Sequence, residues 1–252
     1  MIMLSRKNGS EPENPRSKGI YLLPNLFTTS GLFAGFYAIV AAMRDDFANS
    51  AIAIFIAMIM DGLDGRVARL TNTQSAFGAE YDSLADVVSF GIAPSLVAYS
   101  WGLMSLGKLG WLVAFFYAAA TALRLARFNS RIGKEDSRYF QGLPCPAAAG
   151  LIAAMIWVAH DYGVHRLWVI AAIVTLITGI FMVSSIRYYS FKDIDLKGHV
   201  PFVAVLAVLI MIVCVSIDPP LVLLTGFGCY VLSGPILALR RRYSLWRKMK
   251  RR

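Results

Sequence analysis

The chain of 252 residues alternates between long apolar runs and short polar stretches. A helix needs about 20 mostly apolar residues to cross the hydrocarbon core of a bilayer. By that measure the sequence predicts eight spans, at 22–43, 48–69, 82–105, 109–127, 142–160, 166–184, 200–217 and 220–239. The second is the weakest by hydropathy, because its apolar run ends at Asp61, so a count of six or seven also stays open. The expected fold is an all-α, polytopic membrane bundle with a six-helix core and two further C-terminal helices.

The composition supports a membrane protein. Hydrophobic residues make up 57% of the chain and charged residues 16%, whereas soluble domains carry about 25% charged residues. The mean hydropathy is +0.58. A soluble globular fold is therefore excluded as an interpretation.

The net charge of +10 raises the possibility of nucleic-acid binding, but the distribution of the charge argues against it. With eight spans and both termini in the cytoplasm, 22 of the 25 lysines and arginines fall in cytoplasmic segments. The three in outer segments are Arg44, Lys108 and Arg166. This asymmetry is the one that the positive-inside rule describes. We therefore expect cytoplasmic termini and no nucleic-acid partner.

The two ends of the chain differ from the apolar middle. Residues 1–19 are polar and lack the apolar stretch of a signal peptide, so they are expected to form a disordered cytoplasmic tail. Residues 240–252, RRRYSLWRKMKRR, form a polybasic cytoplasmic tail suited to anionic lipid headgroups. Between them we expect a core at 20–195 and two additional transmembrane helices at 196–239.

Four aspartates stand between apolar runs, at positions 61, 64, 82 and 86. A carboxylate in or near a bilayer costs several kcal/mol unless it is paired, metal-bound or hydrated. Positions 61, 64, 65, 68 and 69 share one face of a helix, and positions 78, 82 and 86 share one face of the next. In the expected topology both faces meet at the cytoplasmic end of one helical hairpin, joined by the short segment TNTQSAF.

These residue types favour phosphoryl-group transfer. Carboxylate oxygens suit Mg²⁺, Mn²⁺ or Ca²⁺, and no Cys/His set indicates zinc. Two such ions could clamp a diphosphate, Arg69 could bind phosphate, and a spare carboxylate could accept a proton from an alcohol. Two alternatives stay open on these residues alone: a cation or proton transporter, and a non-catalytic scaffold whose small residues pack helices.

The pattern Asp61-x-x-Asp64-Gly65-x-x-Ala68-Arg69, followed after eight residues by Gly78-x3-Asp82-x3-Asp86, resembles the signature of the CDP-alcohol phosphatidyltransferase family. The resemblance implies a CDP-linked lipid donor, an alcohol acceptor and one or two divalent metals, Mg²⁺ or Mn²⁺, with Ca²⁺ conceivable in a crystal. It implies that Asp61, Asp64 and Asp82 are metal ligands, and that Asp86 is a metal-adjacent residue and the general base. The implied contacts to the nucleotide or CDP-lipid are Asn25, Thr28, Gly65, Ala68, Arg69 and Gly78.

Three further segments resemble the phosphatidylserine synthase branch of this family: ALRLARFN at 122–129, FQGLPCPAAAG at 140–150 and SIRYYSFK at 185–192. This branch implies transfer of the phosphatidyl group from CDP-diacylglycerol to L-serine, with release of CMP. The candidate contacts to serine or phosphate are Arg124, Arg127, Asn129, Arg187 and Lys192. Another acceptor, such as glycerol 3-phosphate, an inositol phosphate or choline, is the alternative within the family. The resemblance also implies a homodimer among membrane lipids, in a bacterial inner membrane with the active site facing the cytoplasm.

Overall fold

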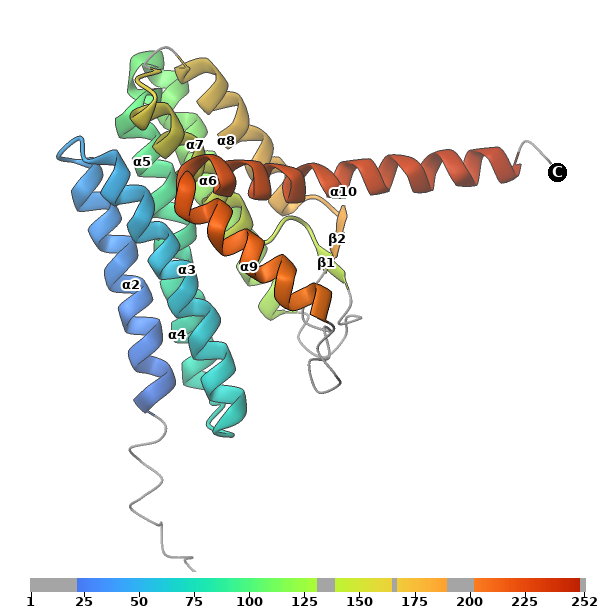
Figure 1. The fold of residues 1–252 in the computed structure, drawn as a ribbon, viewed down its shortest axis with the longest axis horizontal. Coiled ribbons are helices and arrows are strands. Elements are labelled where there is room, and N and C mark those ends of the chain that lie inside the picture. The colour runs from blue at the N-terminus through green and yellow to red at the C-terminus, as the bar shows by residue number, and fades with distance from the viewer. Residues whose placement is uncertain (1–21, 131–138, 165–166, 190–201, 250–252) are drawn as a thin grey trace, which may run out of the picture.

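The computed structural model describes residues 22–130, 139–164, 167–189 and 202–249. Within these ranges the chain forms eight long helices and a short 3₁₀ helix (Leu103–Leu106), so the predicted all-helical architecture is confirmed (Figure 1). The first two are α2 (Leu22–Ala42) and α3 (Phe47–Leu70). The third is continuous over 76–101 and consists of α4 (Ala76–Asp86), a π-helical segment (Val87–Ile92) and α5 (Ala93–Trp101). The others are α6 (Lys108–Asn129), α7 (Cys145–Asp161), α8 (Trp168–Val183), α9 (Phe202–Ile217) and α10 (Pro219–Met249).

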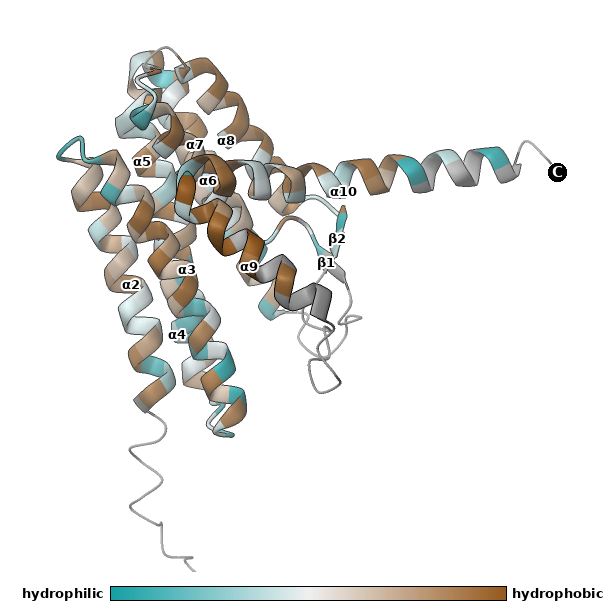
Figure 2. Cartoon of the chain, in the orientation of Figure 1, coloured by the Kyte–Doolittle hydropathy of each residue, from teal (hydrophilic) through white to brown (hydrophobic). Residues whose placement is uncertain are grey.

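The helices have the length and composition of a membrane protein. Four helical stretches of the described chain are long and apolar enough to cross a bilayer: Leu23–Ala42, Ala76–Trp101, Lys108–Asn129 and Pro219–Arg240. The helices α7 and α8 are apolar but shorter. Colouring by hydropathy shows most helices in brown, with polar residues on the facing parts of α3 and α4, in the turn between α2 and α3, and along the C-terminal part of α10 (Figure 2). The chain is thus an integral membrane protein, and α3 and α4 carry polar residues within its otherwise apolar bundle.

The helices pack around α7, which is rich in small residues. Ala148, Ala149, Ala153 and Ala154 of this helix have no exposed surface, and α7 contacts α3, α8 and α10. On one side α2 and α3 run antiparallel, joined by a short turn in which the side chain of Asp46 accepts a hydrogen bond from the Asn49 amide. On the other side α10 crosses α7, and its C-terminal part projects away from the bundle (Figure 1).

The structure departs from the sequence prediction at three places. The third helix covers 76–101 instead of 82–105, because the Ser75 side chain caps it by accepting a hydrogen bond from the Gly78 amide. Two short strands that the sequence did not predict, β1 (Tyr139–Gln141) and β2 (Arg187–Tyr189), pair antiparallel. Finally, α10 continues as a helix to Met249, through residues expected to form a tail. The predicted tail at 1–19 lies outside the described residues.

Candidate active site

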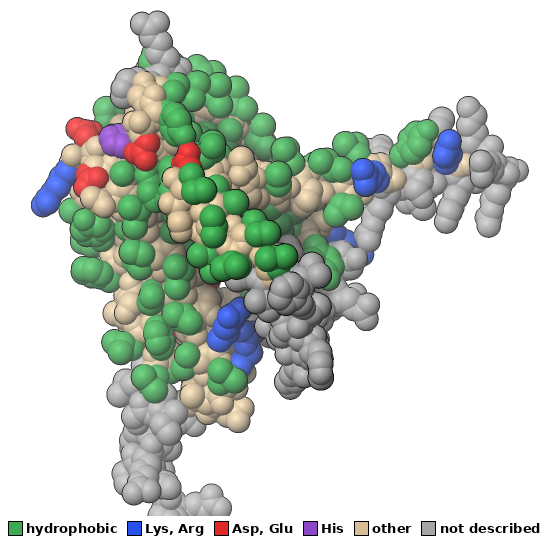
Figure 3. All heavy atoms as spheres, in the orientation of Figure 1, with side chains coloured by type: hydrophobic (Ala, Val, Ile, Leu, Met, Phe, Trp, Pro, Cys, Tyr) green, Lys and Arg blue, Asp and Glu red, His purple; other side chains and the backbone are tan. Residues whose placement is uncertain are grey.

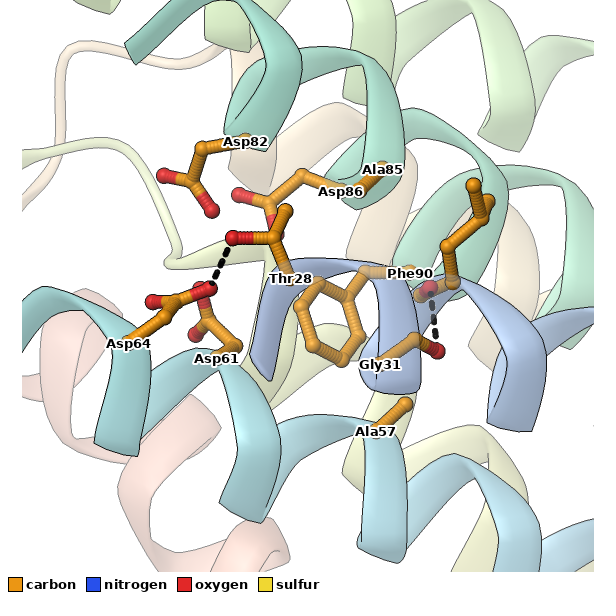
Figure 4. Close-up of a pocket in the computed structure, with 11 residues that line it drawn as sticks. Thr28, Gly31, Ala57, Asp61, Asp64, Asp82, Ala85, Asp86 and Phe90 are labelled. Atoms are coloured by element: carbon orange, nitrogen blue, oxygen red, sulfur yellow. Dashed lines mark hydrogen bonds between the residues drawn. The ribbon is translucent and has the colours of Figure 1, made fainter. Parts of the chain in front are cut away.

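The four aspartates converge at one end of the bundle (Figure 4). Asp61 and Asp64 come from α3, and Asp82 and Asp86 come from α4. They line one small hollow of about 10 Å³ together with Thr28 of α2. A hollow of this size has room for little more than one water molecule or ion.

Local geometry explains why these side chains meet. The helices α3 and α4 are joined by the five residues 71–75, so they fold back on each other as a hairpin. Side chains three and four residues apart share a helix face, which puts each pair of aspartates on one side of its own helix. The structure therefore brings both predicted faces together.

Asp64 has the smallest exposed surface fraction of the four aspartates. It is 5% exposed, and its Oδ2 accepts a hydrogen bond of 2.8 Å from the Thr28 hydroxyl. Thr28 is also 5% exposed, and its one hydroxyl proton is shared between Asp64 and the Pro24 carbonyl, 3.1 Å away and one turn earlier in α2. The side chain of Thr28 thereby ties the first helix to the aspartate cluster.

The aspartates fit a divalent cation. Asp61, Asp64 and Asp82 each offer one carboxylate oxygen, and these three oxygens lie within 4.8 Å of one another. Oxygens that ligate one Mg²⁺ or Ca²⁺ lie about 2.0–2.6 Å from the ion, so two of them can be up to about 5 Å apart. The hard oxygen donors and their spacing thus match the cation that the sequence predicts.

A larger cavity of about 430 Å³ adjoins the hollow and shares Thr28, Asp64 and Asp82 with it. Its volume falls in the range of about 300–1,000 Å³ that is typical of small-molecule sites. It is lined by all the remaining residues expected to contact the nucleotide: Asn25, Gly65, Ala68, Arg69 and Gly78. A β-carbon built on Gly65 would meet no described atom within 4 Å, so this glycine leaves the cavity open rather than serving helix packing.

Sequence reasoning missed part of this cavity. Its wall also includes Pro24, Thr73, Gln74, Ser75 and Ala79. Three of these lie in the linker between α3 and α4, so their position between the two signature helices was the signal that could have identified them. These linker residues add hydroxyl and amide groups to a wall that the signature residues share with the start of α2.

Comparison with known proteins agrees with this geometry. The sequence profile of the CDP-alcohol phosphatidyltransferase family matches residues 21–184, which include both aspartate-bearing helices. The chain belongs to this family. It is 40% identical over 231 residues to the CDP-diacylglycerol–serine O-phosphatidyltransferase of Helicobacter pylori, which covers 89% of this chain and 92% of that protein.

Two more distant relatives carry the same name. The protein of Mycobacterium tuberculosis is 36% identical over 187 residues, covering 68% of this chain and 64% of its own length. That of Saccharomyces cerevisiae is 37% identical over 139 residues, covering half of each chain. Membership of a phosphatidyltransferase family favours group-transfer chemistry over the transporter and scaffold alternatives that the residues alone left open.

Arg124 of α6 is a candidate acceptor contact whose positive charge acts on Asp86 of the cluster. Its Nη1 donates to the Cys145 sulfur at 3.1 Å. Its Nε is buried and has no hydrogen-bond partner among the described residues. A buried donor without a partner is costly, so this guanidinium has a hydrogen bond left to give to a bound anion.

The other four candidates are placed differently in this phosphatidyltransferase. Arg127 donates to the Gln141 side chain at 2.6 Å and to the Val183 carbonyl at 3.2 Å, and so connects α6 with β1 and α8. Asn129 donates to the Ser83 hydroxyl at 2.9 Å. Arg187 is exposed on β2, and Lys192 lies outside the described residues. The described members of this group hold helices together or face outward, and like Arg124 they are not among the residues that line the two cavities.

Proposed function

We propose that this chain transfers the phosphatidyl group of CDP-diacylglycerol to the hydroxyl of L-serine, forming phosphatidylserine and releasing CMP. The observation that carries the proposal is the cluster of four aspartates opening into a cavity of about 430 Å³. The names of its relatives favour serine among the possible acceptors. A different alcohol is the alternative within the family.

The larger cavity would hold the CDP part of the donor. Arg69 supplies a guanidinium for phosphate, and Gly65 and Gly78 let the nucleotide approach the helix backbones. Asn25 and Thr28 supply polar groups from α2. The acyl chains would stay among the membrane lipids that surround the helices.

Asp61, Asp64 and Asp82 would hold a divalent cation, Mg²⁺ or Mn²⁺, and a second ion would involve Asp86. Bound there, such cations neutralise diphosphate charge and make CMP a better leaving group. Asp86 accepts the proton of the serine hydroxyl. The hydroxyl oxygen forms a bond to the lipid-side phosphorus, while the bond from that phosphorus to the CMP oxygen breaks.

Serine recognition would depend on Arg124. The serine carboxylate needs a cation, and the buried Nε of Arg124 lacks a partner among the described residues. Its interaction with Asp86 would bring the bound hydroxyl toward the base. Arg127, Asn129, Arg187 and Lys192 would act around this contact, the first two by holding the helix ends in place.

The charge distribution along the chain supports a cytoplasmic active site. We assign eight membrane spans, both termini to the cytoplasm, and the aspartate cluster to the same side, where serine and nucleotide are available. The membrane would be a bacterial inner membrane, and the enzyme would act there as a homodimer.

The decisive experiment is CMP release by the purified protein from CDP-diacylglycerol. We expect release with L-serine, and little with glycerol 3-phosphate, an inositol phosphate or choline. A chelator should abolish release, and Mg²⁺ or Mn²⁺ should restore it. Faster release with another alcohol would reassign the acceptor. Absence of CMP release with every alcohol, together with ion flux in liposomes, would contradict transfer chemistry altogether.

Asp86→Asn tests the proposed base. The amide keeps the size of the side chain but cannot accept the hydroxyl proton, so turnover should be abolished while CDP-diacylglycerol binding stays measurable. The two readouts are CMP release and equilibrium binding of the donor. Near-wild-type turnover would remove Asp86 from the mechanism.

A further inference from the structure

A buried tyrosine holds the helix segment that directly follows the catalytic aspartates. Residues Val87–Ile92 form a π-helix, in which the Ala93 amide donates five residues back, to the Val88 carbonyl. Pro94 follows and has no N–H, so the Phe90 carbonyl cannot accept the usual hydrogen bond from four residues ahead. The Tyr117 hydroxyl of α6 donates to this carbonyl at 3.1 Å, and Tyr117 has no exposed surface.

The π-helix Val87–Ile92 is in close contact with α6 on one side and with α2 on the other. On the α6 side, a β-carbon on Gly91 would lie 3.1 Å from the Thr121 Cβ. On the α2 side, the Ser89 hydroxyl donates to the Gly31 carbonyl at 3.1 Å, and a β-carbon on Gly35 would lie 2.6 Å from the Ser89 Oγ (Figure 4 shows the bond to Gly31). Little room is left for this π-helix to shift or turn between its neighbours.

The π-helix also forms part of the site itself. It begins at the residue after Asp86, and the Phe90 ring lines the hollow that holds the four aspartates (Figure 4). A π-turn carries about one more residue than an α-turn, so the face that α4 presents depends on where this segment is held. We propose that Tyr117, through the Phe90 carbonyl, is a positioning residue that sets Asp82 and Asp86 against Asp61 and Asp64. The inference rests on the metal-binding role proposed above.

The chain offers a matched control. Tyr188 of β2 is also without exposed surface, and its hydroxyl donates at 3.1 Å to the Val231 carbonyl of α10. Pro235 stands four residues after Val231, as Pro94 stands four residues after Phe90. Tyr188 is not among the residues described as lining the two cavities. Removing its hydroxyl therefore repeats the chemical change of Tyr117→Phe at a place remote from the metal ligands in the chain.

The test compares Mn²⁺ binding by Tyr117→Phe and Tyr188→Phe, measured by electron paramagnetic resonance on the purified protein without substrate. Positioning groups behind metal ligands typically change metal affinity by at least roughly tenfold, so we expect a loss of that size in Tyr117→Phe. Both variants should lower the unfolding temperature by similar amounts. The Mn²⁺ affinity of Tyr188→Phe should lie within about twofold of the wild-type value, because changes at distant sites are independent to about that factor. Equal Mn²⁺ affinity in all three proteins would overturn the proposal.

The double variant Tyr117→Phe/Pro94→Ala separates positioning from simple satisfaction of the carbonyl. The alanine at position 94 has a backbone N–H that can donate to the Phe90 carbonyl within the same helix. The unfolding temperature of the double variant should therefore recover, even if Tyr117→Phe alone fails to fold. The tie to α6 stays broken, so Mn²⁺ binding should remain weak. Recovery of Mn²⁺ affinity would overturn the positioning role. A wild-type protein that binds no Mn²⁺ would overturn the proposed metal site and this inference with it, whereas a change of acceptor alcohol would affect only the proposed function.

Discussion

At the scale of single residues, the aspartate cluster depends on a neighbour from another helix. Thr28 donates to Asp64, whereas the adjacent Thr29 donates to the Asn25 carbonyl at 2.7 Å and bonds the Tyr81 hydroxyl at 2.9 Å. Each threonine hydroxyl lies within hydrogen-bond distance of the backbone carbonyl four residues earlier in α2. Of the two, Thr28 is the one that donates to a carboxylate. A hydrogen bond to a charged group is worth about 1.5–3 kcal/mol.

Thr28→Val should weaken metal binding, because Asp64 loses the donor that orients it. We expect the Mn²⁺ concentration for half-maximal CMP release to rise roughly tenfold. Thr29→Val is the matched control and should leave that concentration near the wild-type value. Equal shifts in both variants would show that the hydroxyl of Thr28 has no specific role at the metal site.

Gly65 and Gly62 allow a second comparison at this scale. Both lie on α3, and a β-carbon at either would meet no described atom within 4 Å, but only Gly65 lines the larger cavity. Gly65→Ala should raise KM for CDP-diacylglycerol, because its methyl group enters the nucleotide space, and should raise the unfolding temperature slightly, because glycine inside a helix is about 0.5–1 kcal/mol less stable than alanine. Gly62→Ala should raise the unfolding temperature in the same way and leave KM unchanged. A normal KM in Gly65→Ala would place the nucleotide elsewhere.

At the scale of elements, α2 and the π-helix approach closely enough to exclude a single methyl group. A β-carbon on Gly35 would lie 2.6 Å from the Ser89 Oγ and 2.7 Å from its Cα, whereas one on Gly31 would make only ordinary contacts of 3.5 Å. The contact at Gly35 involves backbone, which cannot rotate away. These two glycines of α2 therefore differ in what an added methyl group must displace.

Gly35→Ala should be destabilising, since overpacking of a tight contact costs about 1–3 kcal/mol. The measurement is the unfolding temperature of the purified protein in detergent. Gly31→Ala, one turn away on the same helix, is the control and should be much milder. If Gly35→Ala unfolds no earlier than Gly31→Ala, the close packing of α2 on the π-helix is wrong.

At the scale of the whole molecule, the family match ends at residue 184, yet the later helices are built into the fold. The Tyr188 and Tyr230 hydroxyls donate to the Val231 and Tyr189 carbonyls, and so tie β2 and α10 to each other. Phe227 of α10 lies against Gly150 of α7. The space-filling view shows acidic side chains with Lys/Arg side chains beside them at the upper end of the bundle, and further Lys/Arg side chains lower on the bundle and along α10 (Figure 3).

The proposed orientation can be tested by cysteine labelling. In a protein lacking the exposed Cys214 and Cys229, Ala76→Cys would stand at the start of α4 near the aspartates, and Ser105→Cys in the turn after α5. A membrane-impermeant maleimide should label Ser105→Cys in intact cells, and Ala76→Cys only after permeabilisation. The opposite pattern would place the active site outside.

The helices and the pairing of the aspartates could be predicted from the amino-acid sequence alone. Helical period and a five-residue link are local properties, so the spacing from Asp61 to Asp86 was enough to predict that four carboxylates meet. Apolar run length likewise predicted most helix bounds to within a few residues. The start of the third helix was missed because a cap at Ser75, not hydropathy, decides it.

Which distant side chains complete the site became apparent from the packing of the helices. Thr28 meets Asp64 across 36 residues, and Arg124 meets Cys145 across 21. The strands β1 and β2 pair segments from two separate loops. Such contacts depend on how helices pack in space, and no local period encodes that packing. For the same reason the sequence could not distinguish Arg124 from Arg127 as candidate acceptor contacts. In the structure, the buried Nε of Arg124 has no hydrogen-bond partner among the described residues, whereas Arg127 donates to two groups of the protein.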